Sequence, residues 1–382
     1  MNRSTGFYQN LGVNTVINGW SWVTVVGGSL MPQPVMDSML EASRNFVDMH
    51  ELNQKAGEEI ARITGAESGL VTAGSAAGMQ LQAAACITGT DPAKISKLPD
   101  TRKLKNQIVI HRMHRVSYDR CFRGAGADLV EIGDSGNTEP WELEEAINKK
   151  TAAVAYIFGP RKSGDLSLKT VVDVAHSHGV PVIVDAAAML PPVENLTKYI
   201  ELGADMVSFS GGKGIMGPQS SGVLCGRKDL IEAAYLNAAP NSQGIGRPAK
   251  VSKENIAGLI TALQLFVDRD YVSVLDDWRN KCDYIVNQLK TVSGIRVSFS
   301  EANPSLEDSK SNFPRVLIYF EKDWTGPDES EVISMLKNSD PPIYLGTAGP
   351  EGGIAVIPVN LQDGEEEIVA SSIQKVIKRL VQ

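Results

Sequence analysis

Up to Arg227, short apolar runs alternate with amphipathic stretches. The runs are rich in Val, Ile and other apolar residues and are bounded by glycine or polar residues, a pattern that predicts strands. Strand–helix alternation of this kind predicts an α/β fold with a large, mainly parallel, seven-stranded sheet. The expected strands are Gly69–Thr72, Gln107–His111, Asp128–Ile132, Ala152–Phe158, Val180–Asp185, Met206–Ser210 and Gly222–Cys225.

Helices are predicted where apolar residues recur three and four positions apart and end at capping residues. The clearest is Glu51–Thr64, which Gly65 ends. The others expected in this part of the chain are Pro34–Asp48, Ala77–Cys86, Val116–Arg123, Trp141–Asn148, Leu168–His178 and Leu196–Leu202.

After Arg227 the pattern changes to that of a smaller α+β domain. Helical spacing dominates over Val251–Val292, with a break near Val272, and β-like runs follow. These runs are Ile295–Phe299, Arg315–Phe320 and Gly353–Pro358, and a last helix is expected over Glu365–Leu380. The expected division is an N-terminal arm over residues 1–50, a large domain over 51–255 and a small domain over 256–382.

Length and charge narrow the class of protein. A chain of 382 residues exceeds the size of one ordinary core, so two domains are expected. The net charge of −8 gives no general attraction to nucleic acids or membranes, and we expect neither as a partner. The 4 cysteines are scattered without a CxxC pair, which argues against structural zinc and disulfides. With no apolar signal core at the N-terminus, a cytoplasmic location is expected.

Three motifs with chemical potential each follow an expected strand, where ligands bind in open α/β sheets. The first is Gly74-Ser75-Ala76-Ala77-Gly78, a small-residue loop that leads into a helix. Such a loop exposes backbone N–H groups to an anion, although a tight strand–helix turn is the simpler explanation of the loop taken alone. The second is Asp185, which can pair with the protonated ring nitrogen of a pyridine cofactor or act as a helix cap.

The third motif is Ser208-Phe209-Ser210-Gly211-Gly212-Lys213-Gly214. A lysine between glycines after a strand can form a Schiff base with an aldehyde cofactor, and Ser208 and Ser210 can donate to a phosphate. A phosphate-loop lysine needs Ser or Thr directly after it, and Gly214 stands there instead. A plain surface lysine is the remaining alternative. Together, the three motifs match a Schiff-base lysine with an acidic pyridinium partner, which no single motif establishes.

The lysine region resembles that of class-V aminotransferases and cysteine desulfurases. The similarity runs from Val184-Asp185-Ala186-Ala187 to Gly217-Pro218-Gln219 and is closer still to the selenocysteine-synthase group and the D-glucosaminate-6-phosphate ammonia-lyases. The segments Val16-Ile17-Asn18-Gly19 and Ile63-Thr64-Gly65-Ala66-Glu67 resemble the N-terminal half of the lyase group. The resemblance implies a pyridoxal-phosphate (PLP) enzyme of fold type I, assembled as a homodimer or a larger even oligomer.

The resemblance also implies site roles. Lys213 would carry PLP, Asp185 would pair with its pyridine nitrogen, and His114 would stack on its ring, with His111 as a second candidate. Ser75, Ala76, Ala77 and Ser210 would hold the phosphate. Arg247 would bind a substrate carboxylate, and Arg161, Lys162 and Lys250 are further basic candidates.

Two features lie outside this pattern. The relatives carry small residues where this chain has Trp20-Ser21-Trp22, so the indoles are expected either to reshape the substrate space or to pack in a subunit interface. His176 and His178 end an expected helix without a third ligand nearby, so no metal site is predicted.

The expected activity is β-elimination with release of ammonia from an amino acid or amino-sugar acid after Cα deprotonation by Lys213. Racemisation or epimerisation, transamination and Cα–Cβ cleavage use the same deprotonated carbon and stay open. Selenium transfer to a tRNA and a non-catalytic PLP-binding role are further alternatives.

Overall fold

The computed structural model describes residues 6–159, 164–303, 312–322, 324–349 and 352–378. They form two compact units. Unit 1 takes in the described parts of Met1–Ser29, Asp270–Ser305 and Ser311–Gln382, and unit 2 takes in Leu30–Arg269. The chain passes from one unit to the other between residues 29 and 30 and between residues 269 and 270. The domain boundaries expected from the sequence, at 50/51 and 255/256, stay a prediction.

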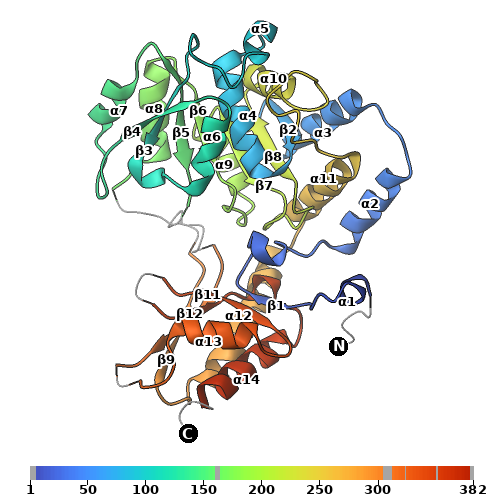
Figure 1. Cartoon of the computed structure of the whole chain (residues 1–382), viewed down its shortest axis with the longest axis vertical. Helices are drawn as coiled ribbons and strands as arrows, with labels where there is room; N and C mark the ends of the chain where they lie inside the picture. Colours follow the sequence, from blue (N-terminus) through green and yellow to red (C-terminus); the bar gives the residue numbers. More distant parts are fainter. Residues whose placement is uncertain (1–5, 160–163, 304–311, 323, 350–351, 379–382) are drawn as a thin grey trace. The chain divides into compact units, whose positions relative to one another are not determined.

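Unit 2 is built on the seven-stranded, mainly parallel sheet that the sequence predicts, with the order β2-β8-β7-β6-β5-β3-β4 (Figure 1). The five strands from β7 to β4 run parallel, and β8 runs antiparallel to both β2 and β7. Every strand end falls within two residues of its expected place. The strands are β2 Ser68–Thr72, β3 Gln107–His111, β4 Asp128–Ile132, β5 Thr151–Ile157, β6 Val182–Asp185, β7 Met206–Ser210 and β8 Gly222–Gly226.

Helices cover both faces of this sheet, which is why its strands are nearly continuous apolar runs. On one face, Ile108, Ile183 and Leu224 form a core with Met79 of α4. On the other, α3, α8 and α9 contact the sheet. The helices of unit 2 are α2 Gln33–Ser43, α3 Met49–Thr64, α4 Gly74–Thr88, α5 Pro92–Ile95, α6 Arg120–Gly124, α7 Pro140–Ala146, α8 Leu168–Ser177, α9 Asn195–Glu201, α10 Lys228–Asn237 and α11 Lys253–Val267, with 3-10 turns η2 Arg112–His114 and η3 Ser117–Asp119.

Capping residues explain where several helices begin and end. Gly65 ends α3 with a left-handed φ of 68°, as predicted. The expected extension of the preceding helix to Asp48 is wrong, because α2 ends at Ser43. The Asp48 side chain instead accepts from the backbone N–H groups of His50 and Glu51, which makes it the cap of α3. The predicted break near Val272 is confirmed between α11 and α12.

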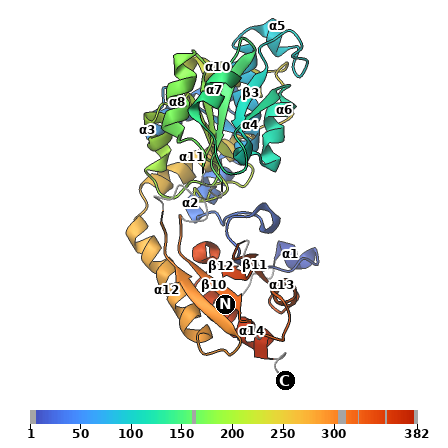
Figure 2. The same ribbon diagram turned by 90° about the vertical axis from the view of Figure 1, so that its left-hand side faces the viewer.

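Unit 1 holds a second sheet in the order β1-β11-β12-β10-β9, with α12 packed against β9 and β10 (Figure 2). The N-terminal segment contributes β1, whose Ile17 pairs with Ile343 of β11. The sequence did not predict β1, β11 or α13. The elements of unit 1 are α1 Phe7–Asn10, β1 Ile17–Gly19, η1 Thr24–Val26, α12 Tyr271–Leu289, β9 Ile295–Ser300, β10 Arg315–Phe320, α13 Glu329–Lys337, β11 Ile343–Thr347, β12 Ile354–Val356, η5 Pro358–Asn360 and α14 Glu365–Lys378.

Candidate functional site

The carboxyl ends of the central strands of unit 2 bring the predicted residues to one edge of the sheet. Asp185 is the last residue of β6, and it lies opposite Ser208 of β7 and Ile157 of β5. Lys213 follows the end of β7 by three residues. Open α/β sheets bind ligands at this edge, where the chain leaves neighbouring strands.

Asp185 is buried, and few interactions stabilise its charged form. Its side chain is 6% exposed, and its Oδ1 accepts from the backbone N–H of Ala187 at 3.0 Å. Burial raises the pKa of Asp185 to about 6, against the opposing effects of the Ala187 hydrogen bond and the positive charge of Lys213. A buried carboxyl of this kind is suited to a cationic partner that arrives with a ligand.

Lys213 stands in a close-packed turn and is not the plain surface lysine that was the remaining alternative. The flanking glycines are required, because a Cβ at Gly212 would lie 2.5 Å from the Cα of Gln219. A Cβ at Gly214 would collide with the backbone of Leu190. The lysine is half-buried, and burial lowers its pKa, with the charge of Asp185 acting in the opposite direction. A lowered pKa leaves more of the amine neutral, the form that attacks a carbonyl or takes a proton.

The small-residue motif forms the first turn of α4 itself and not a loop before it. Gly74 starts the helix with a φ of 80°, and Ala73 at the N-cap has no side chain that could bond to the turn. The first turn carries no acidic residue. Its backbone N–H groups, with Ser75, Ala76 and Ala77 half-buried around them, are therefore available to an anion at the positive end of the helix dipole.

Two glycines allow this helix end to sit directly against the strands. A Cβ at Gly222 of β8 would lie 2.6 Å from the carbonyl carbon of Gly74 and 2.8 Å from the backbone N of Ser75. A Cβ at Gly78 would collide with the hydroxyl of the buried Ser208. That hydroxyl donates to the backbone oxygen of Ser75 at 3.3 Å, so β7 and α4 are linked at the site.

His114 lies in the 3-10 turn that follows β3, and it is buried rather than on the surface. Its Nε2 is 3.1 Å from Oδ2 of Asp165, and its Nδ1 accepts from the backbone N–H of Ile157 at 3.4 Å. The ring of His111 lies beside it, with centroids 4.5 Å apart. Because Ile157 is opposite Asp185 in the β5–β6 ladder, His114 belongs to the same edge of the sheet.

His111 is fully buried at the end of β3. Among the described residues, neither of its ring nitrogens has a hydrogen-bond partner. Burial lowers the pKa of His111 to about 3, so this ring is neutral at physiological pH. Sequence reasoning missed Asp165 and Tyr156, which complete this cluster. The pattern places Tyr156 inside an expected strand, and nothing in the pattern around Asp165 marks it.

The predicted substrate residues are less closely gathered. Arg247 is half-buried after α10, and within the described chain its guanidinium forms no hydrogen bond or ion pair, while Lys250 is exposed. Arg161 and Lys162 lie outside the described residues. Ser210, at the end of β7, is half-buried.

The two indoles of the N-terminal segment differ in their surroundings. Trp20 belongs to unit 1, where it is 36% exposed and stands over Gly346. The expectation for Trp22 is wrong, because this side chain is a core residue of its own unit. It packs edge-on against Trp278 and Phe313, with ring centroids 6.4 Å and 5.4 Å away.

Within the described part of the chain, the two histidines at the end of α8 show no sign of metal binding. His176 Nε2 lies 2.8 Å from Oδ2 of the buried Asp205, and His178 is exposed. Over the described ranges, no three His, Cys, Asp or Glu side chains gather in a way that could hold a metal ion. None of the helices in those ranges has both the length and the apolar character that crossing a bilayer requires.

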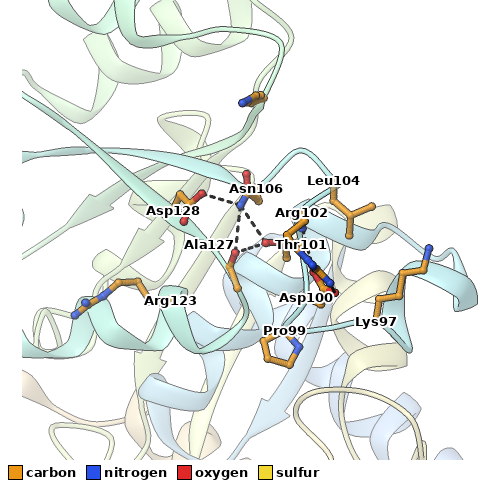
Figure 3. Close-up of a pocket in the computed structure, with 12 residues that line it drawn as sticks. Lys97, Pro99, Asp100, Thr101, Arg102, Leu104, Asn106, Arg123, Ala127 and Asp128 are labelled. Atoms are coloured by element: carbon orange, nitrogen blue, oxygen red, sulfur yellow. Dashed lines mark hydrogen bonds and ion pairs between the residues drawn. The ribbon is translucent and has the colours of Figure 1, made fainter.

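A pocket of about 840 Å³ opens at the opposite edge of the sheet, where the residues before β3, β4 and β5 meet (Figure 3). Its polar groups bond to one another: Asn106 donates to Oγ1 of Thr101 and to Oδ2 of Asp128, both at 3.0 Å. Arg102 forms a two-point ion pair with Asp100. The pocket lies at the amino ends of the strands, so it is separate from the cluster around Lys213.

Comparison with known proteins places this architecture and site in a family. Residues 27–306 match the aminotransferase class-V family, and the chain belongs to it. It is a PLP-dependent enzyme with the α/β architecture of fold type I, as the sequence predicted.

Particular relatives narrow the comparison. The chain is 32% identical over 378 residues to a 5'-C-glycyluridine monooxygenase-decarboxylase from Streptomyces sp., which covers 95% of this chain and 90% of that protein. It is 38% identical over 263 residues to the D-glucosaminate-6-phosphate ammonia lyase of Salmonella typhimurium, which covers 67% and 69% of the two chains. A solved structure of a D-glucosaminate-6-phosphate ammonia-lyase superposes with a TM-score of 0.85 at 30% identity, over 99% of this chain and 100% of the other. The resemblance to the lyase group is thus confirmed.

Proposed function

We propose that this enzyme is a PLP-dependent ammonia-lyase whose substrate is an amino acid or amino-sugar acid with a hydroxyl group on Cβ. The observation that carries the proposal is the gathering of Asp185, Lys213 and the open first turn of α4 at one edge of the sheet. The similarity to a D-glucosaminate-6-phosphate ammonia-lyase over nearly the whole chain supports elimination as the reaction.

The residues at this edge fit PLP by their chemistry. The N–H groups of Ser75, Ala76 and Ala77, with the hydroxyl of Ser210, would hold its phosphate. The hydroxyl of Ser208, expected from the sequence to join them, is buried and donates to the backbone oxygen of Ser75 instead. Asp185 would keep a proton on the pyridine nitrogen, a pairing that also relieves the penalty of its own burial. When bound, PLP supplies an electron sink that stabilises negative charge at the substrate Cα.

Lys213 has two tasks in the proposed reaction. Its amine would hold the cofactor, and when it is free of the cofactor it would remove the Cα proton of the substrate. Its lowered pKa favours the neutral form that both tasks require. Loss of the Cβ hydroxyl then leaves a product that hydrolyses to a 2-oxo acid and ammonia. Arg247, which makes no ion pair within the described chain, would bind the substrate carboxylate.

The second candidate is oxidative decarboxylation. The relative named as a 5'-C-glycyluridine monooxygenase-decarboxylase covers more of this chain than the Salmonella lyase does. Both reactions start from an amino acid bound through its amine. They differ in what is consumed and released: elimination yields ammonia and a 2-oxo acid, whereas the second reaction consumes O₂ and yields CO₂.

The experiment follows all of these quantities in one closed cell. PLP-loaded enzyme is incubated in deuterated buffer with D-glucosaminate 6-phosphate, with serine and threonine, and with a glycyl nucleoside. Ammonia, 2-oxo acid, O₂ and CO₂ are measured, and proton NMR follows exchange at Cα. Equal amounts of ammonia and 2-oxo acid without O₂ uptake support the lyase. O₂ uptake matched by CO₂ release identifies the second candidate, and exchange of the Cα proton without either product identifies a racemase or epimerase.

We also propose a homodimer or larger even oligomer in the cytoplasm. Apolar side chains on α2 and the segment after it are exposed within the single chain, with Met36 at 41%, Leu40 at 51% and Phe46 entirely exposed. A row of this kind favours a subunit interface. The four cysteines are free thiols, as a reducing compartment favours. A monomer in sedimentation at micromolar concentration would contradict the assembly.

A further inference from the structure

Both nitrogens of the His114 ring have partners within unit 2. Nδ1 lies 3.4 Å from the backbone N of Ile157, and Nε2 lies 3.1 Å from Oδ2 of Asp165. A backbone N–H can only donate, so Nδ1 must accept and cannot carry a proton. The ring proton is therefore on Nε2, which donates to the carboxylate of Asp165.

The sheet explains why the N–H of Ile157 is free to bind a side chain. Successive N–H groups of a strand point to opposite neighbours, and that of Phe158 bonds to Asp185 on the β6 side. The N–H of Ile157 therefore points to the β3 side, where the ladder between β3 and β5 has already ended at Ile110 and Ala155. His114 takes the place that the next residue of β3 would have had.

Asp165 is itself held in place. The hydroxyl of Tyr156 lies 3.3 Å from the same Oδ2 that His114 contacts, and 3.2 Å from the backbone oxygen of Leu166. The side chains of His114 and Asp165 are only 8% and 14% exposed, so solvent screens their contact little. The neutral His111 packs beside the ring, so it adds no charge that would turn His114 away from Asp165.

We propose that Asp165 is a positioning residue: the backbone N–H of Ile157 fixes the neutral tautomer of His114, and Asp165 accepts the Nε2 proton and thereby holds the ring in its orientation. This inference rests on the proposed cofactor site, at which His114 is the ring-stacking residue. With both nitrogens occupied at the ring edge, His114 presents only a face of its ring to a ligand. It follows that His114 contributes stacking and shape and does not itself move the substrate proton.

The direct test is nitrogen NMR of the cofactor-free protein with labelled histidine. The chain has 5 histidines, and the spectrum of a His114→Gln variant identifies the His114 signals by their loss. We expect a single neutral tautomer protonated on Nε2 in the wild type and in Asp165→Asn, whose amide oxygen accepts the same bond. Asp165→Ala should keep this tautomer, because the N–H of Ile157 still faces Nδ1, but its Nε2 signal should shift and broaden as the bond to the carboxylate is lost and the ring becomes mobile. A proton on Nδ1 in the wild type, or an Nε2 signal in Asp165→Ala with unchanged shift and width, would overturn the proposal.

A second measurement tests whether Asp165 affects binding at the proposed cofactor site. PLP is titrated into the cofactor-free variants while its visible absorption band is followed. Asp165→Ala should bind PLP about tenfold more weakly with a shifted band, by analogy with the loss seen when outer partners of metal-binding histidines are removed, and Asp165→Asn should recover most of the affinity. The matched control is Asp173→Ala, an exposed carboxylate on α8 that pairs with Lys169.

The two measurements separate failure of this inference from failure of the proposed function. If the wild type binds no PLP, the proposed function fails, while the NMR spectrum still decides the tautomer. If the wild type binds PLP and Asp165→Ala binds it as tightly as the Asp173 control does, the positioning role is refuted. Thermal melting of each variant identifies any loss of folding. If Asp165→Ala does not fold, the isosteric Asp165→Asn keeps the packing and still allows the test.

Discussion

Two buried aspartates at opposite ends of the same sheet differ in the support that their carboxylates receive. Asp205, at the amino edge, accepts from the backbone N of Val182 at 2.7 Å, from His176 at 2.8 Å and from Arg227 at 2.9 Å. Asp185, at the carboxyl edge, accepts one hydrogen bond from the described residues, that of the Ala187 N–H, and burial raises its pKa to about 6. Both side chains are nearly inaccessible to solvent.

We interpret the difference as one between groups that stabilise the fold and groups suited to binding a ligand. At the amino edge, polar side chains form hydrogen bonds and ion pairs with one another, even around a pocket of about 840 Å³. At the carboxyl edge, burial shifts the pKa values of a carboxyl and an amine, and the N–H groups of a helix end lack a side-chain partner among the described residues. Groups with shifted pKa values cluster at functional sites. In this enzyme the proposed site is inferred from the chemistry of its groups and not from the volume of a cavity.

The largest effect is expected at Lys213. Replacement by alanine should lower kcat by about 10²–10⁴-fold or more, because the proposed general base is lost together with the amine that holds the cofactor. Borohydride reduction of the PLP-loaded wild type should attach the cofactor to the peptide that contains Lys213, and mass spectrometry locates it. Lys150→Ala, at the amino-edge pocket, is the control and should leave kcat unchanged. An adduct on another lysine would contradict the assignment.

The next effect tests the two aspartates against each other by stability. The pKa of Asp185 is raised in the folded state, so the protonated carboxyl favours folding below pH 4, and this contribution is lost as the pH rises to about 6. Cofactor-free Asp185→Asn should therefore gain about 2–3 kcal/mol over the wild type at pH 7.5 and little at pH 4. Asp205→Asn should lose about 1–3 kcal/mol at pH 7.5, because a well-bonded carboxylate is removed.

Urea unfolding of the cofactor-free proteins at both pH values measures these differences. Addition of PLP should reverse the order for Asp185→Asn, since the wild-type carboxylate then has a cationic partner. Equal stability changes for the two variants would remove the distinction between the two edges of the sheet.

An intermediate effect is expected at Arg247. Loss of a charge-assisted contact to the substrate carboxylate corresponds to about 1.5–3 kcal/mol, so Arg247→Ala should raise KM by about 10–100-fold and change kcat less. Steady-state ammonia release measures both constants. Arg102→Ala, which removes an exposed arginine of the amino-edge pocket, should leave KM at the wild-type value.

The smallest effect has opposite signs for folding and for binding. In Ser75→Asp, a negative charge in the first turn of α4 should stabilise the cofactor-free protein by about 0.5 kcal/mol through the helix dipole. The same charge should repel the phosphate and weaken PLP binding by about tenfold. Thermal melting and PLP titration measure the two changes, and weaker folding without weaker PLP binding would exclude this helix end as the phosphate site.

Much of unit 2 was predictable because its signals are local. Apolar runs between breakers specify each of the seven strands, and Gly65 specifies the end of α3. The helix predicted through Asp48 failed because a capping aspartate and a helix-interior residue look alike until the backbone N–H groups that Asp48 accepts from are known. In unit 1 the short strands β1 and β11 were not predicted, because they are strands only by pairing with each other across more than 300 residues.

The sequence by itself determined the family, the strand order along the chain and the placement of Asp185 and Lys213 after their strands, since each depends on residue types at short spacing. Only the tertiary structure decided that Trp22 is a core residue, that Lys213 is half-buried and that Asp165 meets His114 across 51 positions. Burial and long-range hydrogen bonding are properties of the packed chain. They set the charge states and ring orientations on which the proposed chemistry depends, and no local pattern encodes them.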